Sequence, residues 1–357
     1  MSRLALGLVL AGALGGCAIL RRPIGPVEPV AGWRAPSFDD DCDAGSARVA
    51  LDRTLPAAVR RGNPAAAVAA ERLREILALP DAHARRAAIL SEFRVLRVRQ
   101  PVLLTAYYEP ELPARQTRDA VYRYPIYARP PDLVDVDPRL LPAGCHGCRA
   151  LSGKIQGKRL VPYLTRAEID AGALEGRGLE LAYTDDLVSL FTLHIQGSGL
   201  IRLPDGSLRG VRFAGTNGRP FRGIARALVA RGYLQPNHTS MADIRRALDA
   251  LPESKRLQML AVDERYTFFR IADGGPVGTL GVELTAGRSI ATDPRWIPLG
   301  SVGYLVTPTY RRFVVSQDTG AAVTGAHADL FLGGGEQAET TAGRTRERGT
   351  LYLIVPR

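Results

Sequence analysis

The sequence is best interpreted from residues 317–335, which read QDTGAAVTGAHADLFLGGG. This stretch holds two carboxylates, Asp318 and Asp329, and each lies next to a short apolar run and to glycine. Short apolar runs bounded by glycine are typical of buried strands joined by tight turns. We therefore predict that both carboxylates lie on strand ends or turns of a β scaffold, where glycine lets a ligand approach the backbone.

Three interpretations of the two carboxylates remain open from this stretch alone. Asp318 before Thr-Gly can be a turn residue that hydrogen-bonds its own backbone. Asp-Thr-Gly is also typical of aspartic proteases, which need two facing aspartates that share a proton. Because the chain has one such motif, a protease of this kind would have to be a homodimer. A carboxyl in an apolar setting, such as Asp329 before Leu330, instead suits the general acid of an enzyme that cleaves glycosidic bonds.

Length and composition indicate a globular protein with more than one folded domain. The chain has 357 residues, of which 46% are hydrophobic and 23% charged, and this is too long for one typical core. Its 25 prolines and 37 glycines favour a turn-rich, β-containing fold. The net charge of +11 favours a polyanionic partner such as an acidic polysaccharide or anionic lipid. Nucleic acid is not expected, because the arginines are scattered and form no basic run.

Residues 1–17 have the pattern of a signal peptide. Arg3 precedes an apolar run over residues 4–14, which is too short to span a bilayer. The small residues directly before Cys17 resemble the lipobox of bacterial lipoproteins, in which this cysteine is acylated and anchors the chain to lipid. Ala18 favours the outer membrane, because lipoproteins kept in the inner membrane often carry Asp there. The alternative is a plain secretory signal whose cleavage removes Cys17.

The segment after the signal peptide is rich in proline. Residues 18–38 are predicted to form an extended, proline-rich tether that holds the body away from the membrane.

Cys42, Cys145 and Cys148 would face an oxidising periplasm. Cys145 and Cys148 form a C-x-x-C pair, which is half of a zinc site and lacks a second pair. We favour a disulfide within this pair, or one from Cys42 to either member of it.

The body of the chain alternates between helical and strand patterns. From about residue 46 to 98 the pattern is helical, and Asn63-Pro64 supplies the cap and first residue of one helix. Further helices are predicted at 83–94, 224–232 and 240–251. Strands are predicted at 102–110, 124–130, 190–199, 282–293, 298–305 and 349–355.

Two of these predicted strands end in residues that suit a sugar site. The stretch 102–110 supplies Tyr107 and Tyr108, and the stretch 190–199 supplies Gln196 and Ser198 beside glycine. Amide and hydroxyl groups bond sugar hydroxyls, and aromatic faces stack on the C–H surface of a sugar ring. An ordinary strand followed by a Gly-Ser-Gly turn explains the second stretch equally well.

Six segments together resemble the family of membrane-bound lytic transglycosylase A (MltA), outer-membrane lipoproteins that cleave murein. They are TAYYEP at 105–110, YPIY at 124–127, QGSG at 196–199, AGTNG at 214–218, RSIATD at 288–293 and the block 318–335. The last block alone resembles the "3D" domain, named for three aspartates that here are Asp293, Asp318 and Asp329. That domain occurs in several wall-active proteins, so the Gln-Gly-Ser-Gly segment is what makes the resemblance specific.

The resemblance implies a mainly β fold with added helices. It consists of a double-psi β-barrel domain plus an inserted second β domain, with a groove for the glycan between them. The domains expected from it are a helical segment at 39–106 that packs with the barrel, the inserted β domain at 107–271, and the double-psi barrel with the 3D domain at 272–357.

The resemblance also implies roles for individual residues. Asp329 falls on the catalytic aspartate of the family and is expected to be the general acid/base. Asp318 is expected to orient the site or to raise the pKa of Asp329 by like-charge proximity. Expected substrate-binding residues are Tyr107, Tyr108, Gln196, Ser198, Gly199, Asn217 and Asp293.

Neither a cofactor nor a metal is expected. The family uses no cofactor, and His327 with Asp329 lacks an indicated third metal ligand. Glu109, which follows the two tyrosines, departs from the family and is expected either to bind a peptide stem or to face solvent.

The expected function is that of a lytic murein transglycosylase, a carbon–oxygen lyase acting on a polysaccharide. It would cleave the β-1,4 bond between MurNAc and GlcNAc without water and leave 1,6-anhydro-MurNAc ends. One acid suffices, because the C6 hydroxyl of the substrate is an intramolecular nucleophile and the deprotonated acid can take its proton. The alternatives are a non-catalytic murein-binding lipoprotein and the homodimeric aspartic protease.

Partners and location follow from the same interpretation. The expected partners are peptidoglycan glycan strands, outer-membrane lipid through acylated Cys17, and proteins of cell-wall synthesis or the divisome. The expected location is the periplasmic face of the outer membrane.

Overall fold

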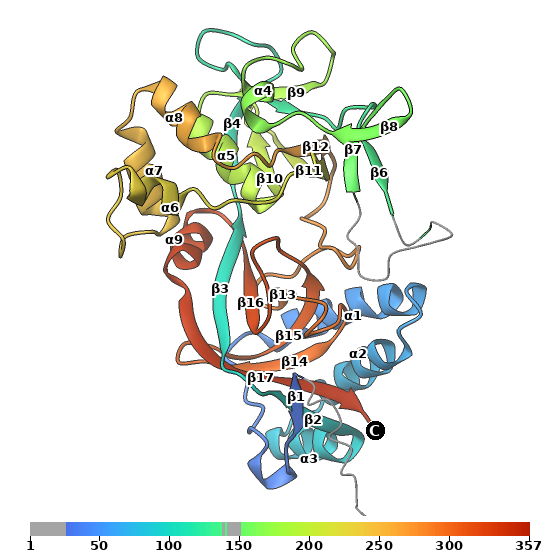
Figure 1. The fold of residues 1–357 in the computed structure, drawn as a ribbon. Coiled ribbons are helices and arrows are strands. Elements are labelled where there is room, and N and C mark those ends of the chain that lie inside the picture. Colours follow the sequence, from blue (N-terminus) through green and yellow to red (C-terminus); the bar gives the residue numbers. More distant parts are fainter. Residues whose placement is uncertain (1–25, 138–139, 141–150) are drawn as a thin grey trace, which may run out of the picture.

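The computed structural model describes residues 26–137, 140 and 151–357. Its α-helices are α1 Ala44–Arg60, α2 Pro64–Ile76, α3 Ala82–Glu92, α4 Arg166–Asp170, α5 Leu187–Gln196, α6 Ala225–Ala230, α7 Met241–Asp249, α8 Glu253–Leu260 and α9 Glu336–Arg344. Its strands are β1 Val27–Pro29, β2 Phe93–Val98, β3 Val102–Glu109, β4 Glu111–Arg115, β5 Tyr124–Tyr127, β6 Val134–Val136, β7 Leu151–Gln156, β8 Arg159–Pro162, β9 Glu180–Thr184, β10 Ser198–Arg202, β11 Leu208–Thr216, β12 Thr267–Ile271, β13 Ser289–Thr292, β14 Val302–Val306, β15 Arg311–Asp318, β16 His327–Gly334 and β17 Arg346–Pro356. Figure 1 shows two β-rich parts, one above the other.

The lower part is a closed β-barrel. Its sheet has the order β1-β2-β17-β14-β15-β13-β16-β3, and β17 also pairs with β3, so the ring from β17 to β3 closes on itself. Closure leaves the ring without exposed edges. Side chains such as Leu104, Val314 and Leu330 are fully buried and form its core. The prediction of a mainly β fold with added helices is confirmed, and the double-psi connectivity stays a prediction.

Strand β3 carries the chain out of the barrel. It pairs with β16 as far as Glu109, which lies opposite Gly334, and β4 then begins at Glu111 in the upper part. Figure 1 shows β3 running from the barrel towards β4. The chain returns after β12, and residues 272–288 lead back to β13. The upper part is therefore inserted into the sequence of the barrel.

The upper part is built on a six-stranded sheet of order β12-β11-β10-β4-β9-β5, with a separate three-stranded sheet β6-β7-β8. Helix α5 packs on the larger sheet, where its Leu190 and Leu193 share a core with Ile126 and Phe269. The opposite side of α5 contributes Phe191 to a second core with helices α6, α7 and α8. Helix α5 is thus buried on both sides and joins the two cores.

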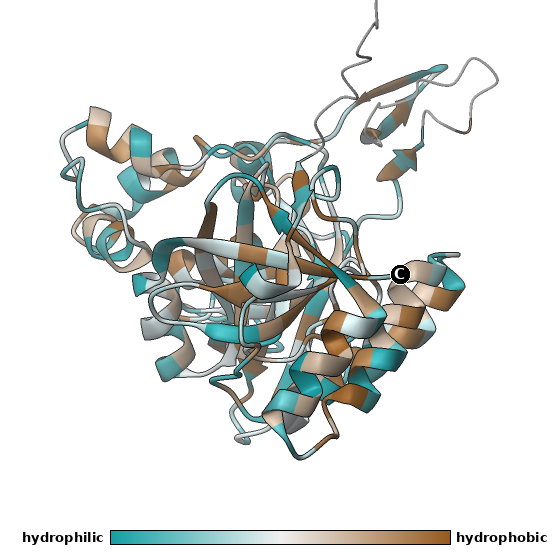
Figure 2. Ribbon diagram, turned by 90° about the horizontal axis from the view of Figure 1, so that it is seen from below, coloured by the Kyte–Doolittle hydropathy of each residue, from teal (hydrophilic) through white to brown (hydrophobic). Residues whose placement is uncertain are grey.

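Helices α1, α2 and α3 belong to the barrel part. Asn63 accepts a hydrogen bond from Ala66 N and Pro64 is the first helical residue, so the predicted start of this helix is confirmed. Asp43 caps α1 in the same manner. The buried faces of the helices share a core with the barrel residues Tyr304 and Phe313. Apolar and polar segments alternate along them in Figure 2, as expected for amphipathic helices.

Several secondary-structure predictions are wrong in part: of the strand predicted at 282–293, for example, only Ser289–Thr292 forms a strand, β13. Residues 187–196, which overlap the predicted strand 190–199, form helix α5, which is capped by Asp186 and ends at Gly197 in a left-handed conformation (φ 76°). Because α5 is apolar on both of its packed sides, its sequence lacks the one-sided periodicity of a surface helix. The helical pattern to residue 98 is also wrong beyond Glu92, because Phe93–Val98 is strand β2.

The prediction that Glu109 binds a peptide stem or faces solvent is wrong as well. Its side chain is buried and lies 2.6 Å from Nη1 of the buried Arg212, which also donates to the Gly199 carbonyl. A buried carboxylate requires a paired charge, and Arg212 on β11 supplies it. Arg212 also hydrogen-bonds the carbonyl of Gly274 on the returning connection. Arg212 therefore connects the two segments that link the parts of the molecule, the end of β3 at Glu109 and the returning connection at Gly274.

Several sequence predictions concern residues outside the described ranges. Cys17, Cys145 and Cys148 lie there, so the lipidation site and the disulfides remain predictions. Sγ of Cys42 lies 3.7 Å from Oγ of Ser46. Within the residues that the structure describes, none of the helices is long and apolar enough to cross a membrane.

Candidate active site

The strand register of the barrel brings Asp318 and Asp329 together. Ala291 on β13 is the register partner of Asp318 on β15 and of Asp329 on β16. On the other side of β16, Thr105 on β3 is the register partner of Asp329. Residues that are neighbours across a sheet direct their side chains to the same face. The two carboxylates of the 317–335 stretch and Thr105 therefore share one face of the barrel wall.

Asp318 is held by three hydrogen-bond donors. Its Oδ1 accepts from the backbone N and from Oγ1 of Thr279, each at 2.9 Å. Its Oδ2 accepts from the hydroxyl of Tyr107 at 3.1 Å. Burial, together with the charges of Asp318 and Asp329, raises the pKa of Tyr107 well above its ordinary value, so this phenol remains a neutral donor. Asp318 is consequently fixed in position beside Asp329.

Asp329 is largely buried, and one of its oxygens is hydrogen-bonded. Oδ1 lies 2.6 Å from Oγ1 of Thr105, which donates to the ionised carboxylate. Burial raises the pKa of Asp329 to about 6; the bond from Thr105 lowers it, and the charge of Asp318 raises it. Burial is thus the main cause of the raised pKa, and the predicted like-charge effect of Asp318 is a smaller contribution with the predicted sign.

His327 lies two residues before Asp329 on β16, and its ring faces Thr105 as well. Nε2 of His327 is 2.8 Å from Oγ1 of Thr105, and the backbone of Ala322 also hydrogen-bonds the ring. Burial and, to a lesser extent, the charge of Arg346 lower the pKa of His327, against the effect of Ala322. The hydroxyl of Thr105 therefore lies between an imidazole and a carboxyl group.

The arrangement can supply a proton to a substrate. A carboxyl group with a pKa of about 6 is half protonated near pH 6, where an ordinary aspartic acid is ionised. Among residues 26–137, 140 and 151–357, no side chain hydrogen-bonds Oδ2 of Asp329, whereas Thr105 holds Oδ1. Asp329 is also only partly exposed to solvent. Oδ2 is thus the atom available for proton transfer.

Asp293 accepts a hydrogen bond from the turn that precedes the two site residues His327 and Asp329. It is buried, and it accepts hydrogen bonds from the Arg295 guanidinium and from the backbone N of Gly325 at 2.9 Å. The bonds from Arg295 are the main cause of its lowered pKa. Gly325 belongs to the turn that leads into His327 and Asp329. Asp293 therefore fixes the turn before the two site residues.

The Gln-Gly-Ser-Gly segment lies where the upper part meets β3. Gln196 ends α5, and Ser198 begins β10; both are partly exposed. Gly199 is buried, and a Cβ at this position would lie 2.6 Å from Leu193 Cδ1 and 2.7 Å from the carbonyl oxygen of Pro110. The residue after it, Leu200, donates its backbone N–H to that same carbonyl. The segment is therefore packed directly on the end of β3.

Two further predicted substrate-binding residues, Tyr108 and Asn217, also have internal partners. Tyr108 is buried, packs against α9 and donates its hydroxyl to Glu339, on the side of β3 opposite to Tyr107. Asn217 is fully buried, and its amide donates to the backbone carbonyls of Leu164 and Glu264. The structure brings neither of them to the two carboxylates.

The described residues contain no group of three or more His, Cys, Asp or Glu side chains that could hold a metal ion.

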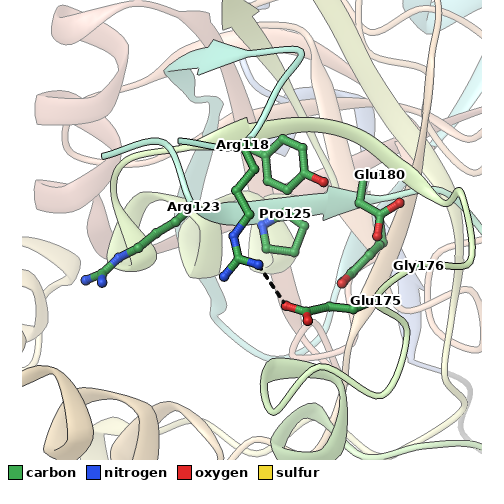
Figure 3. Close-up of a pocket in the computed structure, with 8 residues that line it drawn as sticks. Arg118, Arg123, Pro125, Glu175, Gly176 and Glu180 are labelled. Carbon is green, nitrogen blue, oxygen red and sulfur yellow. Dashed lines mark hydrogen bonds and ion pairs between the residues drawn. The ribbon is translucent and has the colours of Figure 1, made fainter. Parts of the chain in front are cut away.

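A pocket of about 180 Å³ lies at the outer edge of the upper sheet (Figure 3). It is lined by Arg118, Arg123, Pro125, Tyr127, Glu175, Gly176, Glu180 and Tyr183. Arg118 and Glu175 form an ion pair of 3.3 Å across it. None of the candidate site residues lines this pocket.

Two residues that contact the carboxylates, Thr105 and Thr279, are not among the residues predicted from the sequence. Thr105 could have been found, because it lies two positions before Tyr107 on a predicted strand and so shares its face. Thr279 belongs to an irregular connection and carries no comparable signal. For His327 the sequence suggests no role beyond a weak metal ligand, and the structure places it in a hydrogen-bonded series with Thr105 and Asp329.

Comparisons with known proteins agree with this architecture. The family model described as "MltA specific insert domain" matches residues 103–270, and the "3D domain" model matches residues 288–355. Membrane-bound lytic murein transglycosylase A of Escherichia coli K12 is 30% identical over 266 residues, and that of Vibrio cholerae is 29% identical over the same length. These matches cover 71% of this chain and 65% of each relative, so the chain spans about two thirds of the length of these relatives.

Solved structures are similar over nearly the whole chain. The membrane-bound lytic murein transglycosylase from Agrobacterium tumefaciens is 32% identical with a TM-score of 0.81, and the similarity covers 93% of this chain and 98% of that one. E. coli MltA with bound chitohexaose is 26% identical with a TM-score of 0.72, over 88% and 90% of the two chains. The chain therefore belongs to the membrane-bound lytic murein transglycosylase A family.

Proposed function

We propose that this protein is a lytic transglycosylase that cleaves the β-1,4 bond between MurNAc and GlcNAc of peptidoglycan and leaves 1,6-anhydro-MurNAc ends. The observation that carries the proposal is the state of Asp329. Burial raises its pKa to about 6, Thr105 holds Oδ1, and Oδ2 has no partner among the described residues. These are the properties that a general acid for a glycosidic oxygen requires.

In the first step, Asp329 gives the proton on Oδ2 to the glycosidic oxygen while the bond from this oxygen to the anomeric carbon of MurNAc breaks. The carboxylate that forms on Asp329 accepts a hydrogen bond at Oδ1 from the hydroxyl of Thr105, whose Oγ1 is 2.6 Å away. Hydrogen bonds to a developing charge stabilise the transition state. Thr105 would thus stabilise Asp329 as it changes from acid to base.

In the second step, the C6 hydroxyl of the same MurNAc attacks the anomeric carbon and gives its proton to Asp329. The attacking group belongs to the substrate, so the entropic advantage of an intramolecular nucleophile replaces a second catalytic carboxylate. The proton balance closes, because the acid that lost a proton in the first step regains one in the second. No external water is consumed.

Asp318 and Tyr107 are proposed to position the site. Asp318 is bonded to Thr279 and Tyr107, and its charge favours the protonated form of Asp329. Gln196 and Ser198 are proposed contacts for the glycan in a groove between the two parts of the molecule. Tyr108, Gly199, Asn217 and Asp293 are buried, so we propose that they support this surface indirectly.

Murein as the substrate is supported by the relatives and by the charge of the chain. The similar E. coli MltA structure contains chitohexaose, a β-1,4-linked glycan, and a net charge of +11 attracts a polymer that carries carboxylates. We further propose an outer-membrane lipid anchor at Cys17 on the periplasmic face, and contacts with proteins of cell-wall synthesis or the divisome. The names of the relatives, which call them membrane-bound, support the anchor.

The experiment that tests the proposal is digestion of purified murein by a soluble form that lacks residues 1–17 and keeps strand β1. The products are separated and weighed by mass spectrometry, for the native site and for Asp329→Asn. We expect muropeptides one water lighter than hydrolysis products, and none from the variant. Reducing-end products would contradict the lyase reaction. Absence of cleavage by either protein would favour the non-catalytic murein-binding lipoprotein.

The aspartic-protease alternative has little support. A protease dyad needs a second aspartate that shares a proton with Asp318. Both oxygens of Asp318 are already occupied, Oδ1 by Thr279 and Oδ2 by Tyr107. A partner copy could bring its aspartate there only after these bonds were broken.

A further inference from the structure

We propose that His327 is a positioning residue that directs the hydroxyl of Thr105 towards Asp329 and thereby leaves the catalytic proton on Oδ2. The inference rests on the proposed function, because it concerns how Asp329 holds its proton. It starts from three groups in series: His327 Nε2 is 2.8 Å from Thr105 Oγ1, which is 2.6 Å from Asp329 Oδ1.

The hydroxyl of Thr105 has one proton and two neighbours that can accept it. If Nε2 of His327 carries a proton, it donates to Thr105, and the hydroxyl proton of Thr105 goes to Oδ1 of Asp329. The proton of the carboxylic acid then sits on Oδ2, which faces no protein partner among the described residues. This arrangement satisfies every donor and acceptor in the series and presents the acid to a substrate.

If Nε2 lacks its proton, the series reverses. The lone pair on Nε2 then accepts a hydrogen bond from the hydroxyl of Thr105, and the oxygen of Thr105 is left to accept a hydrogen bond from a donor on its other side. Among the residues that the structure describes, the remaining contact of Thr105 Oγ1 is Oδ1 of Asp329, so the acid proton would move to Oδ1 to supply it. The acid would then direct its proton into the protein instead of towards the substrate.

The hydrogen bond at Nδ1 determines which protonation state of His327 makes Thr105 donate to Asp329. The backbone of Ala322 hydrogen-bonds the ring and favours its protonated form, so the Ala322 group must be the accepting carbonyl. With Nε2 on Thr105, Nδ1 is the nitrogen left for this carbonyl. A neutral ring has one N–H and cannot serve both neighbours as a donor, whereas an imidazolium can. Protonated His327 is therefore the form that gives the productive direction while it also donates to the Ala322 carbonyl.

Other charged groups around the series set the pH range. Arg346 on β17 opposes the protonation of His327, and burial does so more strongly. Asp318 on β15 favours the protonated form of Asp329, while Tyr107 on β3 is a neutral phenol. The active form thus carries two titrating protons, one on His327 and one on Asp329, and both are lost as the pH rises.

The test is the slope of the logarithm of murein-cleaving activity against pH above the optimum. The native protein should approach −2, because two protons must be present. His327→Gln, whose amide can donate to Thr105 at every pH, should retain activity to higher pH with a slope of −1. His238→Phe, at an exposed histidine in the upper part, is the matched control and should keep the native slope. A native slope of −1 that His327→Gln leaves unmoved would overturn the inference.

A second measurement does not require activity. The Asp329 carboxyl carbon can be followed by NMR in a 13C-aspartate-labelled protein and identified by its loss in Asp329→Asn. The native signal should titrate in two steps, because it senses His327 through Thr105; His327→Gln and Thr105→Val should each leave one step. One step in the native protein would refute the coupling. Failure of the native protein to cleave murein would contradict the proposed function and leave this titration to decide the inference.

Discussion

The substitution Asp329→Asn should make the protein more stable while it removes the proposed acid. The pKa of Asp329 is about 6 in the folded protein, against an ordinary value of 3.8. Each unit of this difference corresponds to about 1.4 kcal/mol, so ionising Asp329 costs the folded state about 3 kcal/mol. An asparagine never ionises and can still accept the bond from Thr105 through its amide oxygen.

The pH dependence of this effect follows from the raised pKa. The folded protein binds the Asp329 proton more tightly than the unfolded chain does, so this carboxyl group destabilises the native protein progressively as the pH rises from about 4 to about 6. The stability advantage of Asp329→Asn should therefore grow by about 2.4 kcal/mol between pH 4 and pH 8.

Urea denaturation across this pH range measures the advantage, and Asp273→Asn, at an exposed carboxylate in the connection after β12, controls for the loss of one charge. An advantage of Asp329→Asn that is the same at pH 4 and pH 8 would refute the reasoning. It would mean that the barrel does not disfavour the ionised acid.

Three further predictions follow from the same contacts. Asp318→Asn removes a like charge, so the pKa of Asp329 should fall and the alkaline limb of murein cleavage should move to lower pH; an unmoved pH–activity profile would contradict this. Arg212→Met leaves Glu109 buried without its partner and should destabilise the protein by about 3–5 kcal/mol in urea denaturation. Adding Glu109→Gln should recover part of this loss, and no recovery would argue against the ion pair. Gly199→Ala places a methyl group 2.6 Å from a side chain and 2.7 Å from a backbone oxygen and should cost about 1–3 kcal/mol by the same assay, whereas an unchanged midpoint would show that this packing yields.

Local signals were sufficient for part of the fold. Asn63-Pro64 predicts the start of α2 because the cap and the fixed φ of proline act within one turn. The run at 102–110 predicts β3 because its apolar and β-branched residues suit a buried strand. The strand predicted at 190–199 failed because α5 is buried on two sides and has no polar face. Asp186 before it and Gly197 after it were the signals that identify this helix.

The candidate site was accessible only in part, because its contacts are non-local. The sequence points to Asp318 and Asp329 through their glycine-rich surroundings. Their proximity depends on β13, which pairs in parallel with β15 and antiparallel with β16, and no local pattern specifies this register. Thr105 is 224 positions from Asp329 and reaches it only because β3 closes the barrel. The same is true of Glu109 and Arg212, whose pairing depends on where the inserted part crosses the barrel.

The central claim is that Asp329 drives cleavage of the glycan without water, and digestion of murein in 18O-labelled water tests it most directly. Products of the native protein should be one water lighter than hydrolysis products and should contain no 18O, because the C6 hydroxyl supplies the new bond to the anomeric carbon. Asp329→Asn should give no product. Reducing ends that carry 18O would contradict the account, since they require a water molecule as the nucleophile and a second group to activate it.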